Sequence, residues 1–585
     1  MRNQGVALRV PGWGLPQRTF GRRSKSVAII LVLCSYTALV LAMWAPFGPF
    51  SGMAYETTFA LQSQSSSVLQ GFLFGDPLRV HTNFFYHLAY LLSKALAIDG
   101  SWLAYQIVYA LLWLGRGVLC FLIIHRLTPQ ASVFAYLVGA LAIVHASDHA
   151  LNWVGQMNQF GFIFWMLLSF LVLLYALETP HLGRGIALAG VAAAFSYMSL
   201  WSYEAQLPVI LLAAVLLLFW RGRDWRRSAP VVALFLTPAA VYIALNAARY
   251  LHNLHNVGGE YQISLLRADV SAANLLTDLG FNLKYALAFW RWAELMPAQY
   301  ATLNYVLAPL ASGGAFLVGG IGLRLATADK LALPAAESLV ILLLTSALLL
   351  IASFPAYLML NSARWLWRTQ LLAGPFAAVV LAAGVGLSTL VIERLAPKHW
   401  RGHLKLVAVL AFGAIVSFYG ALASERIASF HFDNWERTRA TLAGVLRVVP
   451  RVAPGSIVVL LDVPRKDPAT GNPADPFGDN MWFDVAMKLA YPDANVTGYY
   501  FWPTAEVPPG NRFYSEVRGR DIDRLIVLRK MAEDIRLVNA LPDELPVAAA
   551  SSYEPSRRVL SGSPAAEARN RYLRFVAPWD SSSAH

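Results

Sequence analysis

Ionisable side chains at the borders of long apolar runs are the residues of this chain best suited to chemistry, because charge near a membrane is costly and is usually retained for a function. Glu56 stands in FGPFSGMAYETTFA, about nine residues after the first apolar run. A carboxylate among aromatics at such a border could act as a general base, or could be a solvated loop carboxylate. Asp76, in FGDPLR, could bind substrate, but Gly-Asp-Pro is also a good turn sequence.

A second polar group joins two apolar runs in HASDHALNWVGQMNQF, residues 145–160. His149, Trp153 and Gln156 combine hydrogen-bonding groups with an aromatic ring, which suits recognition of a sugar. The two histidines and the aspartate of this stretch could instead bind a metal ion. A solvated polar loop is the third interpretation. A divalent metal ion is therefore one alternative at this loop, but it is not predicted.

A carboxylate and two arginines complete the set. Glu204, in SLWSYEAQLP, is a single carboxylate in an otherwise apolar stretch and should face the interior of a bundle; a charge at a helix start that points to solvent is the alternative. Arg364 and Arg368, in NSARWLWRTQ, share one face of a helix. Two guanidiniums there could hold a phosphate or pyrophosphate, or could anchor the helix at the interface.

The elements that must position these residues are transmembrane helices. The chain has 585 residues, of which 57% are hydrophobic and 14% charged, whereas soluble domains are about 45–50% apolar and about 25% charged. Crossing a membrane takes about 20 apolar residues. Eleven runs approach this length: 27–47, 103–123, 131–147, 158–177, 184–200, 205–220, 230–248, 302–323, 335–355, 369–392 and 404–424. We therefore predict an α-helical polytopic membrane protein with about eleven transmembrane helices.

One further apolar segment, residues 82–98, is expected to lie on the membrane surface. It is short, its apolar residues recur at helical spacing, and it carries His87 and Lys94. These features indicate an amphipathic interfacial helix rather than a span. Counting it as a crossing would also place the basic loop 221–227 on the side that is poor in Lys and Arg.

The distribution of Lys and Arg predicts the orientation. Short loops on the N-terminal side hold most of them, so the basic residues 1–26 are expected in the cytoplasm. The net charge of +13 then serves orientation, and no nucleic-acid partner is expected. The Ala, Arg and Trp content and the compact loops favour a bacterium. We therefore expect the inner membrane, with the loops 48–102 and 249–301 and residues 425–585 on the periplasmic side.

The tail after the transmembrane domain, residues 27–424, is expected to be a small soluble α/β domain. Hydrophobic runs predict strands at 456–463, 494–501, 523–530 and 572–578 and helices at 440–452 and 480–491. No Gly-rich phosphate loop follows these strands, so no nucleotide site is expected. Cys34 and Cys120, the two cysteines, lie in apolar runs and give no disulfide framework.

The order of these features resembles a family. A long first loop bears an acidic residue, a surface helix follows, then a His-led polar loop with Trp and Gln, a short turn with Tyr-Glu, and a late Arg pair. This pattern is similar to the GT-C superfamily of membrane glycosyltransferases, most of all to mannosyltransferase-like enzymes that use dolichyl- or undecaprenyl-phosphate sugars. The resemblance covers about residues 27–424.

The motifs match the family in part. The family's loop after the third span commonly begins with His and continues to a Trp, as His145 or His149 and Trp153 do here. Its later turn commonly reads Ser-Lys-Glu, where this chain has Tyr203 before Glu204. Its first loop usually carries Asp, where this chain has Glu56.

The resemblance implies a mechanism. A polyprenyl-phosphate-linked sugar would be the donor, with its lipid tail between the spans and the surface helix. Arg364 and Arg368 would hold the phosphate, and Glu56 would take the proton of the acceptor hydroxyl as the anomeric carbon inverts. Asp76, Glu204 and the polar loop would bind substrate. The partners would be membrane lipid, the lipid-linked sugar and an acceptor that is a glycan, a lipid or a protein.

Three other classes of protein stay open on the residues alone. A transporter or flippase of a lipid-linked saccharide would also place charge in the bundle, such as Arg116 in WLGRGV, although the chain shows no repeated halves. A polysaccharide polymerase or ligase would use a related donor. A non-catalytic scaffold would use its outer domain to bind a partner.

Overall fold

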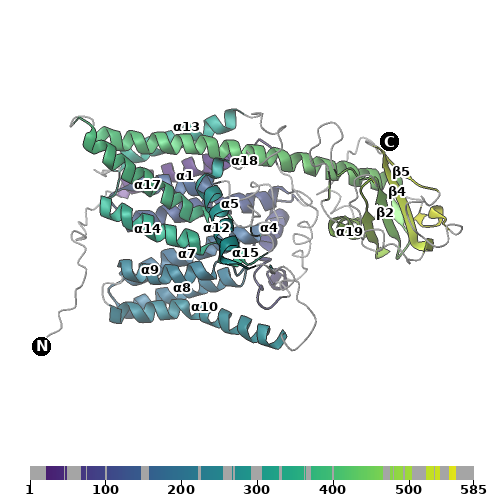
Figure 1. Cartoon of the computed structure of the whole chain (residues 1–585), viewed down its shortest axis with the longest axis horizontal. Helices are drawn as coiled ribbons and strands as arrows, with labels where there is room; N and C mark the ends of the chain where they lie inside the picture. Colours follow the sequence, from purple (N-terminus) through teal and green to yellow (C-terminus); the bar gives the residue numbers. More distant parts are fainter. Residues whose placement is uncertain are drawn as a thin grey trace.

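A computed structural model shows how these segments fold. It describes residues 22–44, 46–48, 68–73, 76–98, 102–145, 157–221, 225–253, 267, 270–291, 306–327, 333–360, 363, 370–397, 401–465, 475–477, 480–491, 494–503, 522–531, 534–539 and 553–560. Long helices lie side by side in a bundle, and one of them continues into a smaller α/β domain (Figure 1). We call the end of the bundle nearest that domain the domain-side end.

A helix lies at each of the eleven predicted apolar runs, since lipid leaves the backbone only internal hydrogen-bond partners. These helices are α1 (Arg22–Trp44), α5 (Leu103–Leu127), α6 (Ser132–Val144), α7 (Met157–Glu178), α8 (Leu182–Leu200), α9 (Leu207–Arg221), α10 (Trp225–Asn253), α13 (Leu307–Ala326), α14 (Ala336–Ala352), α17 (Gly374–Leu395) and α18 (Arg401–Val448). Among the described residues, eight helices are long and apolar enough to cross a membrane. The chain is therefore a polytopic helical membrane protein.

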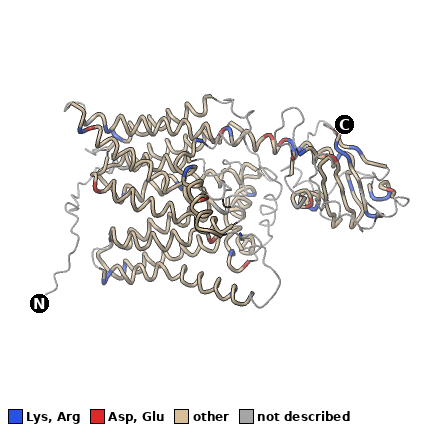
Figure 2. The backbone as a smooth tube through the Cα atoms, in the orientation of Figure 1, with Lys and Arg blue, Asp and Glu red and all other residues tan. Residues whose placement is uncertain are grey.

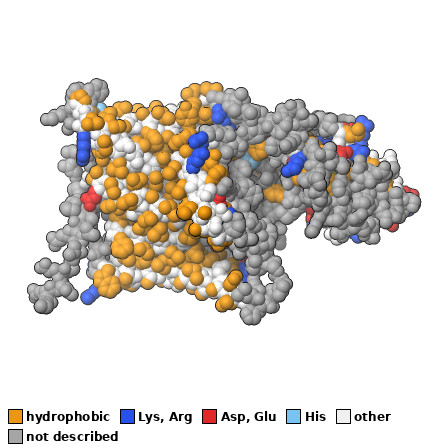
Figure 3. All heavy atoms as spheres, in the orientation of Figure 1, with side chains coloured by type: hydrophobic (Ala, Val, Ile, Leu, Met, Phe, Trp, Pro, Cys, Tyr) orange, Lys and Arg blue, Asp and Glu red, His pale blue; other side chains and the backbone are white. Residues whose placement is uncertain are grey.

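The surface of the bundle agrees with this conclusion. Charged residues lie mostly at its ends and in the C-terminal domain (Figure 2), and apolar side chains cover the face of the bundle seen in Figure 3. Large exposed apolar residues occur on many of its helices, for example Leu111, Phe219 and Val318. A soluble monomer rarely exposes so much contiguous apolar surface, so lipid is its natural contact.

Helix α6 forms the centre of the bundle. All thirteen of its residues are buried, and it packs against α1, α5, α13, α17 and α18. Small residues allow this close packing, as in other membrane bundles: a Cβ on Gly139 would lie 2.6 Å from the backbone oxygen of Gly117 on α5. At about 20 Å, α6 is shorter than the ~30 Å hydrocarbon core. The polar loop that begins at His145 therefore starts inside the protein.

Short helices cover the domain-side end. They are α3 (Val68–Gly71), α4 (Phe84–Ala95), α12 (Ala272–Leu287) and α15 (Pro355–Leu358). Helix α4 lies in the segment expected on the surface, and its twelve residues are too few to cross a bilayer. Helix α12 is amphipathic and is capped at its N-terminus by Ser271, whose Oγ accepts a hydrogen bond from the Asn274 backbone N–H.

Helix α18 runs without a break from the bundle into the C-terminal domain. Its 48 residues reach about 72 Å, more than twice the ~30 Å of a hydrocarbon core. The sequence predicted two separate helical pieces, 404–424 and 440–452. The structure instead joins them, ends the helix at Val448 and starts strand β1 (Arg451–Val452) directly afterwards.

The C-terminal domain contains a four-stranded sheet of order β3-β2-β4-β5. Strands β2 (Ile457–Leu461), β3 (Thr497–Tyr500) and β4 (Leu525–Met531) are parallel, and β5 (Asp534–Leu537) is antiparallel to β4. Helix α19 (Asn480–Ala490) connects β2 to β3, and β1 pairs with β6 (Val559–Leu560). Single turns of 3₁₀ helix, η6 (Ile522–Arg524) and η8 (Pro555–Arg557), precede β4 and β6. The strands expected at 456–463, 494–501 and 523–530 and the helix expected at 480–491 are present, whereas 572–578 lies outside the described residues.

The close contact of α5 and α6 gives a test of the bundle core. A Cβ added to Gly139 would meet the Tyr36 hydroxyl at 2.1 Å, whereas one added to Gly190 on α8 meets nothing within 4 Å. We expect Gly139→Ala to destabilise the protein by about 1–3 kcal/mol through overpacking. Gly190→Ala should leave stability unchanged or raise it slightly. Thermal unfolding in detergent measures both, and equal midpoints for the two variants would contradict this packing.

Candidate functional site

Asp76 and Glu204 are the two predicted binding residues that the structure describes, and both are ion-paired at the domain-side end. Arg79 donates from Nε to Glu204 Oε2 at 3.1 Å and from Nη2 to Oε1 at 2.5 Å. Asp76 Oδ1 accepts from Arg249 Nη1 at 3.3 Å. The chain before α4 is thereby joined both to the turn between α8 and α9 and to the end of α10.

We call residues 76–83, which carry Asp76 and Arg79, the strap. Asp76 shapes its turn, because Oδ1 also accepts from the Leu78 backbone N–H at 3.0 Å. Further along, Thr82 Oγ1 donates to the Ser202 carbonyl at 3.1 Å. The His81 backbone N–H donates to the Trp201 carbonyl at 3.1 Å. The strap thus holds the α8–α9 turn by main-chain as well as ionic contacts.

The ion pair with Glu204 sets the charge state of Arg79. Burial of the guanidinium opposes its charged form, but attraction to Glu204 and the hydrogen bonds to it outweigh this, so the pKa of Arg79 is raised. The guanidinium carbon also lies 5.3 Å from the ring centroid of Tyr203, which stacks on Phe162. With both carboxylate oxygens bound to Arg79, Glu204 holds the strap in place, and a ligand would have to compete with Arg79 for it.

The other six predicted site residues lie outside the described residues: Glu56, His149, Trp153, Gln156, Arg364 and Arg368. The described residues that flank two of these groups meet on one helix, α12. Asn282 donates from Nδ2 to the Ala363 carbonyl at 2.9 Å, and Gln370 Nε2 donates to the Asn282 carbonyl at 3.1 Å. Ala363 and Gln370 flank the Arg364–Arg368 stretch, so both of its ends are fixed to the same residue.

The start of the polar loop is bonded to α12 one helical turn from Asn282. His145 Nε2 donates to the carbonyl of Ala286 at 2.8 Å, four residues after Asn282 and on the same face. The two anchor points are about 6 Å apart along the helix axis. Helix α12 therefore brings the start of the His149–Gln156 loop and both ends of the Arg364–Arg368 stretch together.

A buried arginine stands beside this meeting point. The guanidinium of Arg116, on α5, lies 4.7 Å from the ring centroid of Trp113 and 4.8 Å from that of Phe160. It donates from Nη2 to the carbonyl of His145 at 3.4 Å. His145 is the C-cap of α6, where the helix dipole favours a cation. Arg116 thus fixes the point at which the polar loop leaves α6.

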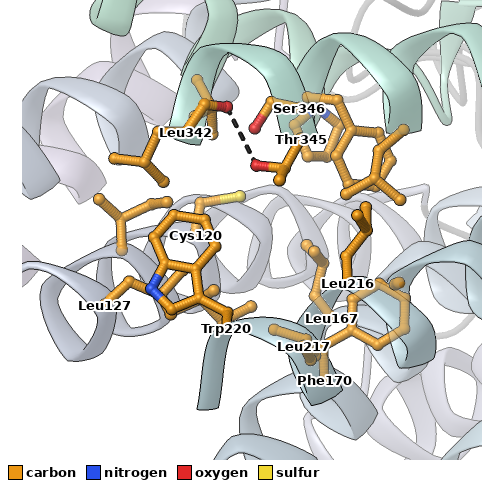
Figure 4. Close-up of a pocket in the computed structure, with 17 residues that line it drawn as sticks. Cys120, Leu127, Leu167, Phe170, Leu216, Leu217, Trp220, Leu342, Thr345 and Ser346 are labelled. Carbon is orange, nitrogen blue, oxygen red and sulfur yellow. Dashed lines mark hydrogen bonds between the residues drawn. The ribbon is translucent and has the colours of Figure 1, made fainter. Parts of the chain in front are cut away.

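An apolar cavity lies among α5, α7, α9, α14 and α17 (Figure 4). It is lined almost wholly by apolar side chains, among them Cys120, Leu217 and Trp220. The Thr345 hydroxyl at its wall donates to the carbonyl of Ile341 on its own helix, at 2.7 Å. The cavity therefore offers a hydrocarbon-like space, as an alkyl or isoprenoid chain requires.

Sequence reasoning missed the groups that bind the predicted residues. Arg79 lies 125 positions from Glu204, and nothing in the local sequence pairs them. Asn282 in the amphipathic helix α12 and Gln370 at the start of the apolar run 369–392 belong to no motif, although polar side chains at membrane depth are a usable signal. The buried pair of Arg267 with Asp278, at 2.6 Å, was likewise missed. Among the described residues, no group of three His, Cys, Asp or Glu could hold a metal ion.

Comparison of the chain with models of protein families gives no match, and comparison with curated proteins gives none either.

The Arg79–Glu204 pair can be measured by a double-mutant cycle. We expect Arg79→Met and Glu204→Gln to be coupled by about 1 kcal/mol in the free energy of unfolding, because the pair is bidentate and half-buried. The control pair is Arg557 with Glu554, which is largely exposed and should couple by about 0.5 kcal/mol or less. Equal coupling in both pairs would show that the strap is not held by this contact.

His81 gives the strap a predictable pH response. Its ring lies edge-on to Tyr197, with centroids 5.1 Å apart, and burial lowers the pKa of His81. The unfolded chain then binds a proton more readily than the folded one, so folding stability falls as pH drops below about 6.5. We expect His81→Phe to reduce the loss of thermal stability between about pH 7 and 5. His252→Gln, at an exposed position on α10, should not.

Proposed function

We propose that this protein is a membrane glycosyltransferase of the GT-C kind, which transfers a sugar from a polyprenyl-phosphate donor to an acceptor hydroxyl. In this proposal the chain crosses the bacterial inner membrane at all eleven apolar helices, the short α6 included. The N-terminus is cytoplasmic, and the domain-side end faces the periplasm. Nucleotide sugars stay in the cytoplasm, so a site on the outer side needs a lipid-linked donor.

The meeting of chain segments on α12 is the observation that carries this proposal. His145, which opens the His149–Gln156 loop, bonds Ala286, and the residues on either side of the Arg364–Arg368 stretch bond Asn282. A donor phosphate and its sugar need cationic and hydroxyl-binding groups within one small space. Two polar segments far apart in the sequence therefore start from one place at the end of an otherwise apolar bundle.

The end of α1, which leads to Glu56, and helix α18 also lie close to the end of α6, where the polar loop begins. The last turn of α1 leads to the segment that carries Glu56, and Phe47 just beyond it lies 5.9 Å, ring to ring, from Phe432 on α18. On α18, a Cβ at Gly420 would be 2.6 Å from the carbonyl oxygen of Val144, at the end of α6. The chain thus enters the Glu56 segment beside the same helices that border the polar loop.

The proposed reaction is a single inverting displacement. The acceptor oxygen forms a bond to the anomeric carbon as the bond from that carbon to the phosphate oxygen breaks. Glu56 takes the acceptor proton. Arg364 and Arg368 stabilise the charge on the departing polyprenyl phosphate. Asp76 and Glu204 would then act indirectly, through the strap that closes this end of the bundle.

The apolar cavity supplies a place for part of the donor's tail. It lies among α5, α7, α9, α14 and α17 and presents a lining suited to hydrocarbon. Burial of isoprenoid methylenes there would stabilise the complex by about 0.8 kcal/mol for each group. The cavity favours a lipid-linked substrate over a water-soluble one.

Substitution of the proposed base tests the reaction. We expect Glu56→Gln to lower sugar transfer about 10²–10⁴-fold, because an amide cannot accept the proton, while binding of the donor is kept. Glu337→Gln, at the exposed start of α14 and the opposite end of the bundle, is the matched control. Transfer of radiolabelled sugar from polyprenyl phosphate in proteoliposomes is the measurement.

The same vesicles separate the alternatives. Unchanged transfer in Glu56→Gln would remove the base assignment. Movement of the intact donor across the bilayer without transfer would favour a flippase. Extension of a lipid-linked glycan from a lipid-pyrophosphate donor would favour a polymerase, and no donor binding at all would favour a scaffold.

A further inference from the structure

The C-terminal domain has a topological switch point that the proposed reaction does not use. From β2 the chain crosses through α19 to β3 on one side, and β4 lies on the other side of β2. In open sheets with parallel strands, ligands bind outside the carboxyl ends of the strands at such a point. The carboxyl ends of β2 and β3 lead to Asp462 and Phe501, respectively.

This carboxyl edge is turned toward the membrane domain. Thr438 on α18 donates to the carbonyl of Pro476 at 2.5 Å, a few residues before the start of α19. Eleven residues later, directly after α18 ends, the carbonyl of Val449 accepts from the hydroxyl of Tyr491 at 2.6 Å, and Tyr491 directly follows the far end of α19. Because α18 leads away from the bundle, Thr438 is nearer to the bundle than Val449. Its partner Pro476 precedes α19, on the side of the sheet where β2 ends, so the carboxyl edge is the one that faces the bundle.

The edge also lies close to the bundle. Phe432 on α18 still packs against Phe47, at the end of α1. Thr438 follows six residues later, which is about 9 Å along the helix axis. The Lys530 ammonium, near the carboxyl end of β4, reaches Thr441 on the same helix at 3.5 Å. A ligand at the edge would therefore lie only about 10 Å above the domain-side end of the bundle.

The side chains at this edge form a fixed polar and aromatic group. Asp475 Oδ2 accepts from the Tyr500 hydroxyl and from Trp502 Nε1, each at 2.8 Å, which fixes the orientation of the indole ring. The Arg465 guanidinium carbon lies 4.6 Å from the centroid of that ring, and Arg465 is exposed. Asp462 is held in the left-handed region, with φ of 58°, a conformation that costs energy outside glycine.

The described carboxylates at the edge each accept a hydrogen bond or an ion pair from a neighbouring side chain. Asp462 pairs with Arg529 on β4 at 2.9 Å, and Arg465 faces the indole ring whose nitrogen Asp475 binds. Among the described residues here, each carboxylate thus has a bound donor, and the Lys530 ammonium is directed to Thr441 on α18. Donors and acceptors beside an aromatic ring match a neutral, hydroxyl-rich ligand, since hydroxyls both donate and accept.

We propose that the carboxyl edge of β2–β3–β4 binds a neutral saccharide, with Arg465 and Trp502 as its main contacts. That this saccharide is the acceptor of sugar transfer rests on the proposed function, whereas the binding itself does not. The edge then holds the acceptor above the bundle while the donor lies in the membrane.

Direct binding without any donor tests the site. The full chain in lipid nanodiscs is applied to an array of printed oligosaccharides that includes neutral hexose, N-acetylhexosamine and uronic-acid glycans. We expect neutral glycans to be bound, and the strongest of them to lose about tenfold or more in affinity in Arg465→Ala. Arg465 is exposed, so this change leaves the fold intact, and Trp502→Phe gives a second variant that keeps an aromatic ring but loses the indole N–H.

The matched control is Arg557→Ala, another exposed arginine of the same domain, which lies in η8 away from the carboxyl edge. Its glycan affinity should equal that of the unmodified chain. The proposal is overturned if no printed glycan is bound, if only uronic-acid glycans are bound, or if Arg465→Ala binds as well as Arg557→Ala. Loss of transfer with glycan binding intact would count against the proposed reaction alone.

Discussion

The length of α18 constrains the rest of this molecule. A helix of 48 residues cannot fit within a bilayer, and it carries the sheet domain outside on the same element that packs against α6 and α13 within the bundle. No loop intervenes at which the two parts could move freely. The height and rotation of the C-terminal sheet above the bundle therefore follow from the geometry of α18. The direction of its strands relative to α18 is set by the turn after Val448.

Inside the bundle, the short helix α6 has the corresponding effect. A fully buried helix that stops before the bilayer surface leaves space in which polar chain can lie at membrane depth, surrounded by protein. Arg116 and Ala286 hold its end through His145. The strap is bound to the α8–α9 turn, where Arg79 donates two hydrogen bonds to Glu204. The apolar bundle thus has one end built from polar contacts.

The transmembrane helices and three of the four expected tail strands could be predicted because their signals are local. A run such as 158–177 shows its burial in its own composition, and SIVVLLDV shows its strand tendency in the same way. The continuity of α18 could not be predicted, since SERIASFHFDNWERTR is polar enough to read as the start of a soluble domain. Its helix is stabilised by tertiary contacts such as Phe432 with Phe47.

The candidate site was harder to predict than the fold for a similar reason. Glu204 was recognised as a carboxylate in need of a partner, but the choice of Arg79 depends on a contact across 125 positions. Asn282 and Gln370 showed no motif, because their role comes from a meeting of α12 with the chain around Ala363. The residue types therefore indicate which side chains could take part in chemistry, whereas the partners of those side chains are known only from the tertiary structure.

The outer stretch of α18 contains neither glycine nor proline between Gly420 and Gly444, the residues at which helices most readily bend. It therefore behaves as a stiff spacer. Each residue of helix sets the sheet about 1.5 Å farther from the lipid and turns it by about 100°. The number of residues in this one helix therefore determines the distance between the sheet and the membrane and the direction of the sheet. Together these set how far, and in which direction, a saccharide bound at the sheet can extend toward the membrane.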